Sequence, residues 1–306
     1  MINLDRTDLK VHPLCLGGNV FGFSADVPNS EAVLDYYFDN GGNFVDTADM
    51  YSQWAPGHVG GESETVIGNW MKKRGNRREM VIATKVSKLD TRPGLKPANI
   101  VAACDDSLRR LQTDYIDLYY SHQDDLDTPM EETLTAYDSL VKAGKVRYIA
   151  ASNFTAERLA KSLEISQSHG LVSYVASQDQ YNLMDRDYEK TLMPTLKATG
   201  LSQIPFYGLA RGFLTGKYRP GVSVESVRSA GVTSTYAHER GWTILAKLDQ
   251  IAKEKNSPVA AVALAWLRAQ PTVAAPIASA TKLEQIKEIM PVIALTSDEL
   301  QLLTNS

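Results

Sequence analysis

The sequence predicts a single α/β domain spanning residues 1–306 and folded as a (β/α)8, or TIM, barrel with its active site at the C-terminal ends of the strands. Eight short apolar segments alternate with amphipathic helical segments, a rhythm typical of parallel βαβ units. Most of these segments are nearly continuous apolar runs, as expected for strands buried on both faces. No shift in composition marks a second domain, and 306 residues suit one large barrel.

The first half of the chain supplies four of the eight units. The expected strands are residues 14–17, 44–46, 80–85 and 115–120. Helical patterns follow them over residues 29–40, 63–73, 97–111 and 129–142. Apolar side chains three or four positions apart, as at Met130, Leu134 and Tyr137, indicate the buried faces of these helices. Gly144 follows the fourth helix, where glycine often ends a helix.

The second half repeats the pattern with one long interruption. The expected strands are residues 146–151, 174–178, 203–206 and 272–275. The expected helices are residues 155–167, with Thr155 as the N-cap, followed by 189–199, 242–255 and 258–270. A segment rich in Gly, Ser and Thr, residues 208–241, separates the seventh strand from the helices that follow. Connections of this length are usually functional, so we expect it to serve a site.

Composition excludes several classes of function. The net charge of −4 and the absence of a basic block interleaved with aromatic residues argue against a nucleic-acid partner. The N-terminus lacks the pattern of a signal peptide, and no run approaches the roughly 18 apolar residues of a membrane helix. We therefore expect a cytoplasmic protein without a membrane partner. Two cysteines and scattered histidines predict neither a disulfide framework nor a metal site.

Polar residues or glycines follow most of the predicted strands, where barrel enzymes place their active sites. They are Gly17, Gly18, Asn19, Asp46, Lys85, His122, Ser152, Asn153, Gln178, Phe206 and Tyr207. Tyr51 lies in the loop just beyond Asp46. Each position alone also has a structural explanation, such as a helix cap at Asp46 or a hydrogen-bonded structural histidine at His122.

Taken together, four of these side chains could act in one catalytic reaction. Lys85 beside Tyr51 would stabilise the phenolate and lower the Tyr51 pKa from about 10. Asp46 would neutralise the buried ammonium of Lys85, which is costly to leave unpaired. His122 could donate a hydrogen bond to a substrate carbonyl and orient it. A carbonyl held between Tyr51 and His122 could accept a hydride and then a proton, so we predict reduction of an aldehyde or ketone.

The same residues carry a resemblance to the aldo-keto reductases that covers nearly the whole chain. Residues 43–51, Asn-Phe-Val-Asp-Thr-Ala-Asp-Met-Tyr, resemble the D-T-A-x-x-Y signature of that family. Further family-like motifs are Ala83-Thr84-Lys85, residues 118–122, Ser152-Asn153-Phe154, Gln180-Tyr181-Asn182 and residues 209–218. The resemblance implies a catalytic tetrad in which Tyr51 is the general acid, Asp46 and Lys85 tune it, and His122 orients the substrate.

The resemblance also implies NADPH as the cofactor, bound in an extended form without a Rossmann domain. The chain indeed has no good G-x-G-x-x-G after a strand. Ser152, Asn153 and Gln178 match the residues that hold the nicotinamide carboxamide, and either Phe206 or Tyr207 stacks on the ring. Residues 209–217 would follow the pyrophosphate. The resemblance also implies that Lys282 contacts the 2′-phosphate, because Gln285 stands where the family has an arginine.

The expected cofactor contacts form one set, drawn from the ends of five strands. They are Gly18, Asn19, Ser152, Asn153, Gln178, Phe206, Tyr207, Gly208, Leu209, Arg211, Gly212, Lys217, Ser279, Thr281, Lys282 and Gln285. Phe21, Phe23 and Trp54 either line the substrate site or anchor their loops. Substrate choice is expected in the loops of residues 21–28, 52–61, 123–128 and 218–239.

Two other functions keep the same barrel. The chain could be a cofactor-binding, redox-sensing subunit with little turnover, like the channel β-subunits of the aldo-keto reductase family. It could also be a lyase in which Lys85 forms a Schiff base, although the cofactor segments argue against this. The sequence leaves open the physiological substrate, the direction of reaction, and the choice between a monomer and a homo-oligomer.

Overall fold

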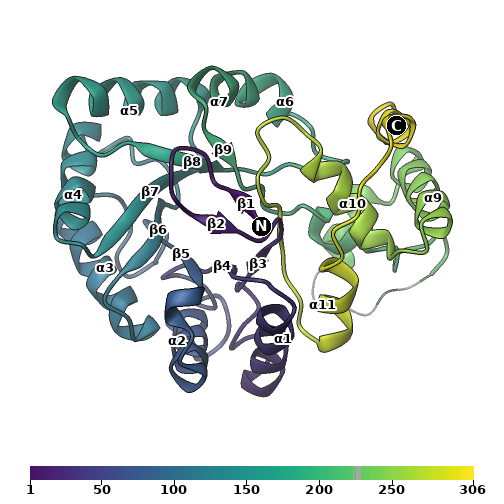
Figure 1. Cartoon of the computed structure of the whole chain (residues 1–306), viewed down its shortest axis with the longest axis horizontal. Coiled ribbons are helices and arrows are strands. Elements are labelled where there is room, and N and C mark those ends of the chain that lie inside the picture. The colour runs from purple at the N-terminus through teal and green to yellow at the C-terminus, as the bar shows by residue number, and fades with distance from the viewer. Residues whose placement is uncertain (223, 225–228) are drawn as a thin grey trace.

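A computed structural model of the chain describes residues 1–222, 224 and 229–306 and has the expected barrel architecture (Figure 1). Eight parallel strands form one curled sheet in the order β10-β3-β4-β5-β6-β7-β8-β9. The strands are β3 (Cys15–Gly17), β4 (Phe44–Asp46), β5 (Val81–Val86), β6 (Ile116–Ser121), β7 (Val146–Ser152), β8 (Tyr174–Gln178), β9 (Ser202–Gln203) and β10 (Ile277–Ala278). The (β/α)8 prediction is therefore confirmed.

The barrel closes between β9 and the segment that leads into β10. The Gln203 amide donates to the carbonyl of Thr272 over 2.7 Å, and the Ala274 amide donates to the carbonyl of Gln203 over 2.9 Å. Two residues beyond Gln203, the Pro205 carbonyl accepts from the Ile277 amide over 2.8 Å. These bonds join the two edges of the sheet, so the carboxyl ends of all eight strands meet at one mouth.

Helices surround the sheet, and the last of them gather on one side of it, at the right of Figure 1. The helices of the first six units are α1 (Val27–Asp39), α2 (Glu62–Arg74), α3 (Pro97–Leu111), α4 (Met130–Lys142), α5 (Ala156–His169), α6 (Tyr188–Thr191) and α7 (Met193–Thr199). Those of the C-terminal third are α8 (Ser229–Tyr236), α9 (Glu239–Glu254), α10 (Val259–Arg268), α11 (Leu283–Ile289) and α12 (Ser297–Thr304). Two short 3-10 helices are η1 (Arg77–Glu79) and η2 (Ala210–Thr215). None of the described helices is long and apolar enough to cross a membrane.

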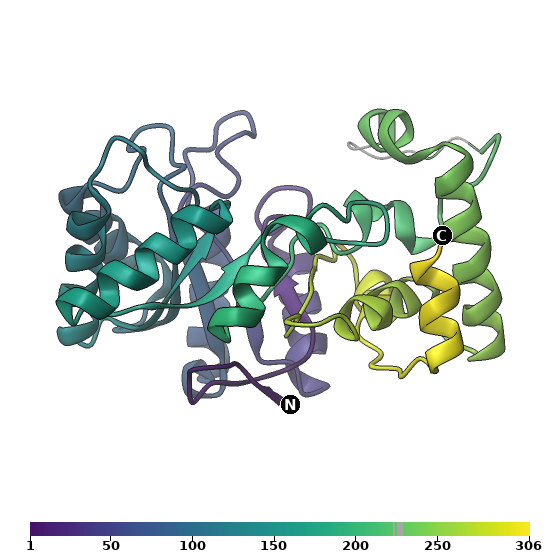
Figure 2. The ribbon, with the colours of Figure 1, turned by 90° about the horizontal axis from the view of Figure 1, so that it is seen from above.

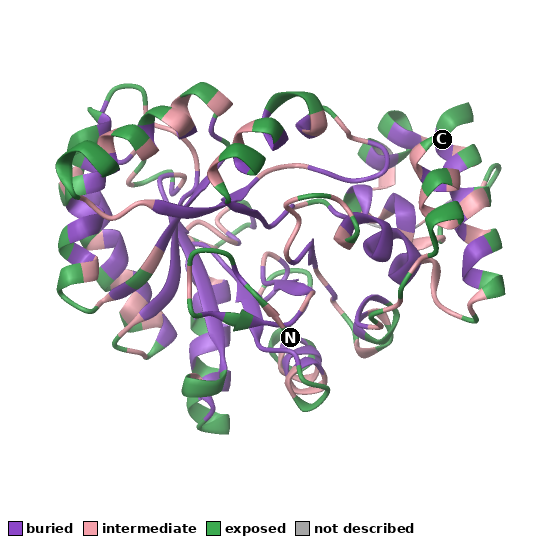
Figure 3. Ribbon diagram, turned by 45° about the horizontal axis from the view of Figure 1, so that its top comes forward, coloured by how far each residue is buried: buried purple, intermediate pink, exposed green. Residues whose placement is uncertain are grey.

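Alternation along the strands creates two apolar cores. Successive strand residues point to opposite faces of the sheet. On β4, for example, Phe44 packs inside the barrel, whereas Val45 packs against the surrounding helices. Figure 3 shows this arrangement as buried strands within helices whose outer faces are exposed. Near its carboxyl end, beyond the last apolar residue that points into the barrel, a strand can therefore point a polar side chain toward the mouth.

The last two predicted strands are wrong in position. The seventh strand covers Ser202–Gln203 instead of residues 203–206, because Pro205 has no amide proton for a sheet hydrogen bond. The eighth covers Ile277–Ala278 instead of residues 272–275. Thr272 has a left-handed φ of 71°, and Val273 makes only an isolated bridge to Gln203. The residues that pair with β3 come after Pro276.

Two helix predictions also need correction. The expected helix over residues 189–199 is divided into α6 and α7 at Leu192. Pro194 is the reason, because a proline has no amide proton to continue the hydrogen bonds of α6. The segment expected as a long connection, residues 208–241, contains η2, α8 and the start of α9. Residues 223 and 225–228 of that segment lie outside the described residues.

An N-terminal hairpin closes the bottom of the barrel. Strands β1 (Ile2–Asn3) and β2 (Lys10–Val11) pair antiparallel, and Leu4, Leu9 and Val11 pack into the interior core. Figure 2 shows the hairpin on one side of the barrel and the long loops on the opposite side. The mouth formed by the carboxyl ends of the strands is thus the accessible end of the barrel.

Candidate active site

The neighbouring strands β4 and β5 bring Asp46 and Lys85 together at the mouth. Asp46 is the last residue of β4, and Lys85 lies near the end of β5, two positions beyond the interior residue Ala83. Both side chains therefore point inward. Tyr120 occupies the matching position on β6, paired in register with Lys85, and His122 is two residues further along. These side chains all point into the mouth because successive residues of a strand alternate between the two faces of the sheet.

The ammonium group of Lys85 is fully buried and makes three hydrogen bonds. It donates to Asp46 Oδ2 at 2.6 Å, to the Thr47 carbonyl at 2.8 Å and to the Tyr51 hydroxyl at 2.9 Å. An ammonium group has three donors, so its hydrogen-bonding capacity is used completely. Burial lowers the Lys85 pKa, and Asp46 partly offsets that effect.

The Tyr51 hydroxyl completes a triangle with these two residues. It donates to Asp46 Oδ2 over 3.1 Å, while Gln178 Nε2 donates to Asp46 Oδ1 over 2.8 Å. Burial raises the pKa of Tyr51 well above its ordinary value, and Asp46 raises it further. The expectation that Lys85 lowers this pKa is wrong for this structure. The Asp46 carboxylate cancels much of the attraction of the Lys85 cation, so burial decides the direction.

His122 faces Tyr51 from the end of β6. The two rings meet edge to face, with centroids 6.0 Å apart, and His122 is only 8% exposed. Burial lowers the His122 pKa well below its ordinary value, and the cations of Lys85 and Lys88 lower it further. The imidazole is therefore neutral at physiological pH. A neutral imidazole beside a phenol can donate one hydrogen bond to a carbonyl oxygen.

A cavity of about 880 Å³ opens beside these side chains. Its lining includes three members of the expected tetrad, Asp46, Tyr51 and His122. Lys85 does not line it, because the lysine lies behind Tyr51. Fifteen of the sixteen expected cofactor contacts line it: Asn19, Ser152, Asn153, Gln178, Phe206, Tyr207, Gly208, Leu209, Arg211, Gly212, Lys217, Ser279, Thr281, Lys282 and Gln285.

Gly18 is the exception. Its amide donates to the Asp46 carbonyl over 2.7 Å, and its own carbonyl accepts from the Ser63 hydroxyl over 2.7 Å. Gly18 therefore lies in the wall behind the cavity, and the neighbouring Gly17 lines it instead. A Cβ atom on Gly17 would lie 2.5 Å from Ser279 Oγ, so only glycine fits between β3 and the segment after β10.

The residues expected near a nicotinamide carboxamide are joined to one another by hydrogen bonds. Ser152 donates to the Gln178 carbonyl over 2.8 Å. Asn153 donates from Nδ2 to the His122 carbonyl and to Ser152 Oγ, both over 2.9 Å. Its backbone is left-handed, with a φ of 57°, and its amide donates to Asp179 Oδ1. This network fixes the side chains and leaves Asn153 Oδ1 as an acceptor for a ligand.

Left-handed residues concentrate in the segment that follows β9. Tyr207, Ala210, Arg211 and Gly212 all have φ values between 47° and 98°. Such conformations are costly for residues other than glycine and occur mainly at functional sites. The Arg211 guanidinium covers the Tyr207 ring at 4.8 Å.

The far end of the cavity is formed by the start of α11. Lys282 is the N-cap of this helix. Gln285 Oε1 accepts hydrogen bonds from the amide and the hydroxyl of Thr281, at 2.7 Å and 3.1 Å. Glu288, which was not expected here, also lines this end. The charged side chains that line the cavity away from Tyr51 include Lys217, Lys282 and Glu288.

Sequence reasoning missed part of the lining. The lining residues that were not expected are Val20, Met50, Lys88, Ile277, Ala278, Glu288 and Ile289. Val20, Met50 and Lys88 lie in loops, where no periodic signal gives the direction of a side chain. Of the three loop aromatics, Trp54 lines the cavity and Phe21 is fully buried as a loop anchor. Phe23 packs edge to face on Trp54 with centroids 6.0 Å apart.

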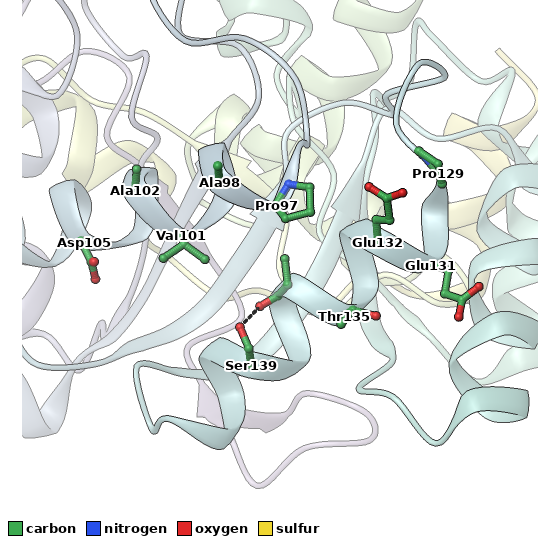
Figure 4. Close-up of a pocket in the computed structure, with 11 residues that line it drawn as sticks. Pro97, Ala98, Val101, Ala102, Asp105, Pro129, Glu131, Glu132, Thr135 and Ser139 are labelled. Carbon is green, nitrogen blue, oxygen red and sulfur yellow. Dashed lines mark hydrogen bonds between the residues drawn. The ribbon is translucent and has the colours of Figure 1, made fainter.

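A second hollow lies outside the barrel between α3 and α4 (Figure 4). It has a volume of about 800 Å³ and is lined by Pro97, Val101 and Glu132 among others. Two of its carboxylates already have partners, since Asp105 pairs with Lys145 at 2.6 Å and Glu131 lies 3.4 Å from the His169 ring. The hollow is remote from the strand ends, so it is not the candidate active site.

Comparison with known proteins assigns the family. The sequence model of the Aldo/keto reductase family matches residues 13–305. The chain belongs to the aldo/keto reductase family. It is 33% identical to the uncharacterized oxidoreductase YrpG of Bacillus subtilis over 97% of this chain and 91% of YrpG. This aldo/keto reductase is accordingly an oxidoreductase, and enzymes of its family act on small-molecule carbonyl compounds.

Other relatives of this aldo/keto reductase differ in what their names describe. It is 30% identical to norsolorinic acid reductase of Aspergillus flavus, over 95% of this chain and 76% of the relative. It is 35% identical to a putative voltage-gated potassium channel subunit beta of Schizosaccharomyces pombe, over 93% of this chain and 85% of the relative. The family thus includes reductases and a putative channel subunit at similar distances from this chain.

Proposed function

We propose that this aldo/keto reductase uses NADPH to reduce an aldehyde or ketone to an alcohol, with chain 1–306 acting as one domain. The observation that carries the proposal is the triangle of Asp46, Tyr51 and Lys85 beside a neutral His122. It places a proton donor and a carbonyl-orienting group at one end of a cavity. Cations and left-handed backbone lie at the other end, where a dinucleotide phosphate would need them.

The lining of the cavity fits this cofactor. Gly17 leaves room between β3 and β10 that a Cβ atom would fill. Ser152, Asn153 and Gln178 would hold the carboxamide, and residues 208–217 with Lys217 would contact the pyrophosphate. Phe206 is proposed to stack on the nicotinamide, because Arg211 already covers the ring of Tyr207. When bound, the nicotinamide supplies the hydride. Lys282, which lines the cavity as the N-cap residue of α11, would contact the 2′-phosphate.

Tyr51 supplies the proton in this mechanism. Addition of that hydride to the carbonyl carbon would form a C–H bond and shift the π electrons of the C=O bond to the oxygen, which Tyr51 and His122 would hold. The O–H bond of Tyr51 then breaks, its proton forms the alcohol O–H, and water returns a proton to the phenolate. The raised pKa of Tyr51 keeps the phenol protonated before the step. Lys85 stabilises the phenolate afterwards, and His122 holds the carbonyl oxygen.

The test is replacement of the proton donor alone. Tyr51→Phe should lower kcat for aldehyde reduction by about 100-fold or more, the usual contribution of a general acid. NADPH binding, measured by fluorescence, should persist. Tyr148→Phe is the matched control, because that hydroxyl bonds Asp8 and lies outside the cavity. Unchanged turnover in Tyr51→Phe would contradict the mechanism.

A cofactor-binding subunit with little turnover is the second candidate. The similarity to a putative channel subunit beta favours it. That function predicts tight NADPH binding, negligible reduction of every aldehyde tested, and a stable complex with another protein. A Schiff-base lyase fits less well, since all three donors of Lys85 are engaged and the lysine does not line the cavity.

A further inference from the structure

We propose that Lys88 binds an anionic group of the substrate, so that the natural substrate is a carbonyl compound that also carries a carboxylate. The inference rests on the proposed function and names the substrate class for the same site. It depends on the position of Lys88, on the absence of an ion-pair partner for its ammonium among the described residues, and on the apolar side chains around it.

Lys88 belongs to the substrate end of the cavity. It lines the cavity three residues beyond Lys85, in the loop that follows β5. In the closed ring of eight strands, β5 lies opposite β9, and the segment proposed to contact the pyrophosphate follows β9. Its charge acts on His122, because Lys88 is among the groups that lower the His122 pKa. Lys88 thus faces the carbonyl-binding side rather than the phosphates.

No carboxylate of the described chain pairs with the Lys88 ammonium within 4.0 Å. The nearest acidic residue in sequence, Asp90, accepts a hydrogen bond from Gln53 instead. Lys88 is half-buried, and partial burial together with Lys85 lowers its pKa. An ammonium removed from water without a partner is costly, so an anion at this position would recover free energy.

The other titratable side chains named at this end of the cavity add no net charge. Asp46 neutralises Lys85 across a 2.6 Å ion pair, and His122 is neutral. Glu288 lies at the far end, beside α11. The net charge at the substrate end of the cavity is therefore positive, and it comes from Lys88.

Aromatic side chains define the rest of the surface. Trp54 packs edge to face on Tyr51 with ring centroids 6.2 Å apart, and Phe23 packs on Trp54 from the other side. Met50 and Val20 add aliphatic surface. A substrate that suits this end has an apolar body, a carbonyl near Tyr51 and a carboxylate within reach of Lys88.

The experiment compares acids with their neutral esters. Ortho-, meta- and para-carboxybenzaldehyde are each paired with the corresponding methyl ester, and kcat/KM is measured with NADPH. For at least one ring position the wild type should prefer the acid by about tenfold, the scale of a close charge pair. Lys88→Gln should abolish that preference and Lys88→Arg should retain most of it. Lys72→Met, on the exposed face of α2, should leave the preference unchanged.

Equal or greater activity on the ester at every ring position would overturn the inference while leaving the reductase function in place. Absence of turnover on all six compounds would overturn the reductase function instead. In that case binding of benzoate, followed by Trp54 fluorescence, decides the role of Lys88. Weaker binding to Lys88→Gln than to Lys88→Arg would support an anion site, and equal binding would refute it.

Discussion

At the scale of single residues, Asp49 shows how this barrel treats a carboxyl group outside the Asp46–Tyr51–Lys85 triangle. It is 1% exposed, and neither carboxyl oxygen has a hydrogen-bond partner among the described residues. Its amide donates to the Lys85 carbonyl over 3.1 Å. Burial raises the Asp49 pKa to about 7, Glu64 adds to the increase, and Arg110 and Arg92 oppose it. The carboxyl group is therefore protonated in much of the folded protein near neutral pH.

Asp49 should make stability depend on pH. Between about pH 4 and pH 7 the unfolded chain releases this proton and the folded chain keeps it, so the free energy of unfolding falls as pH rises. Each unit of pKa shift corresponds to about 1.4 kcal/mol. Asp49→Asn removes this contribution. The Tm of the variant should therefore gain on that of the wild type as the pH rises from about 5 to about 8, a range that covers the upper part of this window. Asp114→Asn, at an exposed site, is the control, and parallel Tm profiles would contradict the assignment.

Residue chemistry could be predicted only in part from the sequence. Asp46, Tyr51 and Lys85 were expected to meet, and their side chains are within 3.1 Å of one another. The direction of the Tyr51 pKa was not predictable, because it depends on how completely the ring is buried. Lys88 and Glu288 were missed for a similar reason, since a loop lysine and a helix glutamate usually point to solvent.

At the scale of elements, the contact between β3 and β10 forms one edge of the cofactor cavity. Gly17 pairs with Asp46 on one side of β3, and Leu16 pairs with Ala278 of β10 on the other. A Cβ atom on Gly17 would lie 2.5 Å from Ser279 Oγ and 2.9 Å from Ile277 Cγ2. Any larger residue must push the two strand ends apart.

Gly17→Ala should therefore weaken NADPH binding by about tenfold, or roughly 1.4 kcal/mol, and also lower Tm. The dissociation constant is measured by fluorescence titration. Gly231→Ala is a matched control, because no described residue lies within 4 Å of its Cβ position and alanine favours the helix α8. An unchanged dissociation constant in Gly17→Ala would show that this edge does not contact the cofactor.

Long periodic elements were predicted well and short ones poorly. The helix over residues 97–111 has the bounds of α3, and Thr155 caps α5 through a hydrogen bond from the Arg158 amide. Strands β9 and β10 have two residues each, too few for a pattern of alternation. Their position is set by closure of the barrel, which is a long-range property.

At the scale of the whole molecule, stability and function are assigned to opposite ends of the barrel. The hairpin of β1 and β2 packs Leu4, Leu9 and Val11 into the bottom, and the candidate active site occupies the top. Barrel enzymes generally separate the two ends in this way. The hairpin was not predicted, because its strands of two residues carry no periodic signal.

Leu9→Ala should lower the free energy of unfolding by about 2–5 kcal/mol, as expected when a buried leucine is truncated. The KM for NADPH, measured well below Tm, should not change, because the cavity is at the other end. Val292→Ala, at a side chain that is 54% exposed, should affect neither property. A raised KM in Leu9→Ala would show that the two ends are coupled.

In the proposed reaction, NADPH bound in the cavity transfers a hydride to a carbonyl carbon beside Tyr51. Its most direct test uses NADPH deuterated at the transferable position of the nicotinamide, with mass spectrometry of the alcohol formed from a simple aldehyde. The wild type should form alcohol with one deuterium on the carbinol carbon. Tyr51→Phe should form no labelled alcohol above background. Alcohol without deuterium, or equal labelling by both proteins, would contradict the proposed reaction.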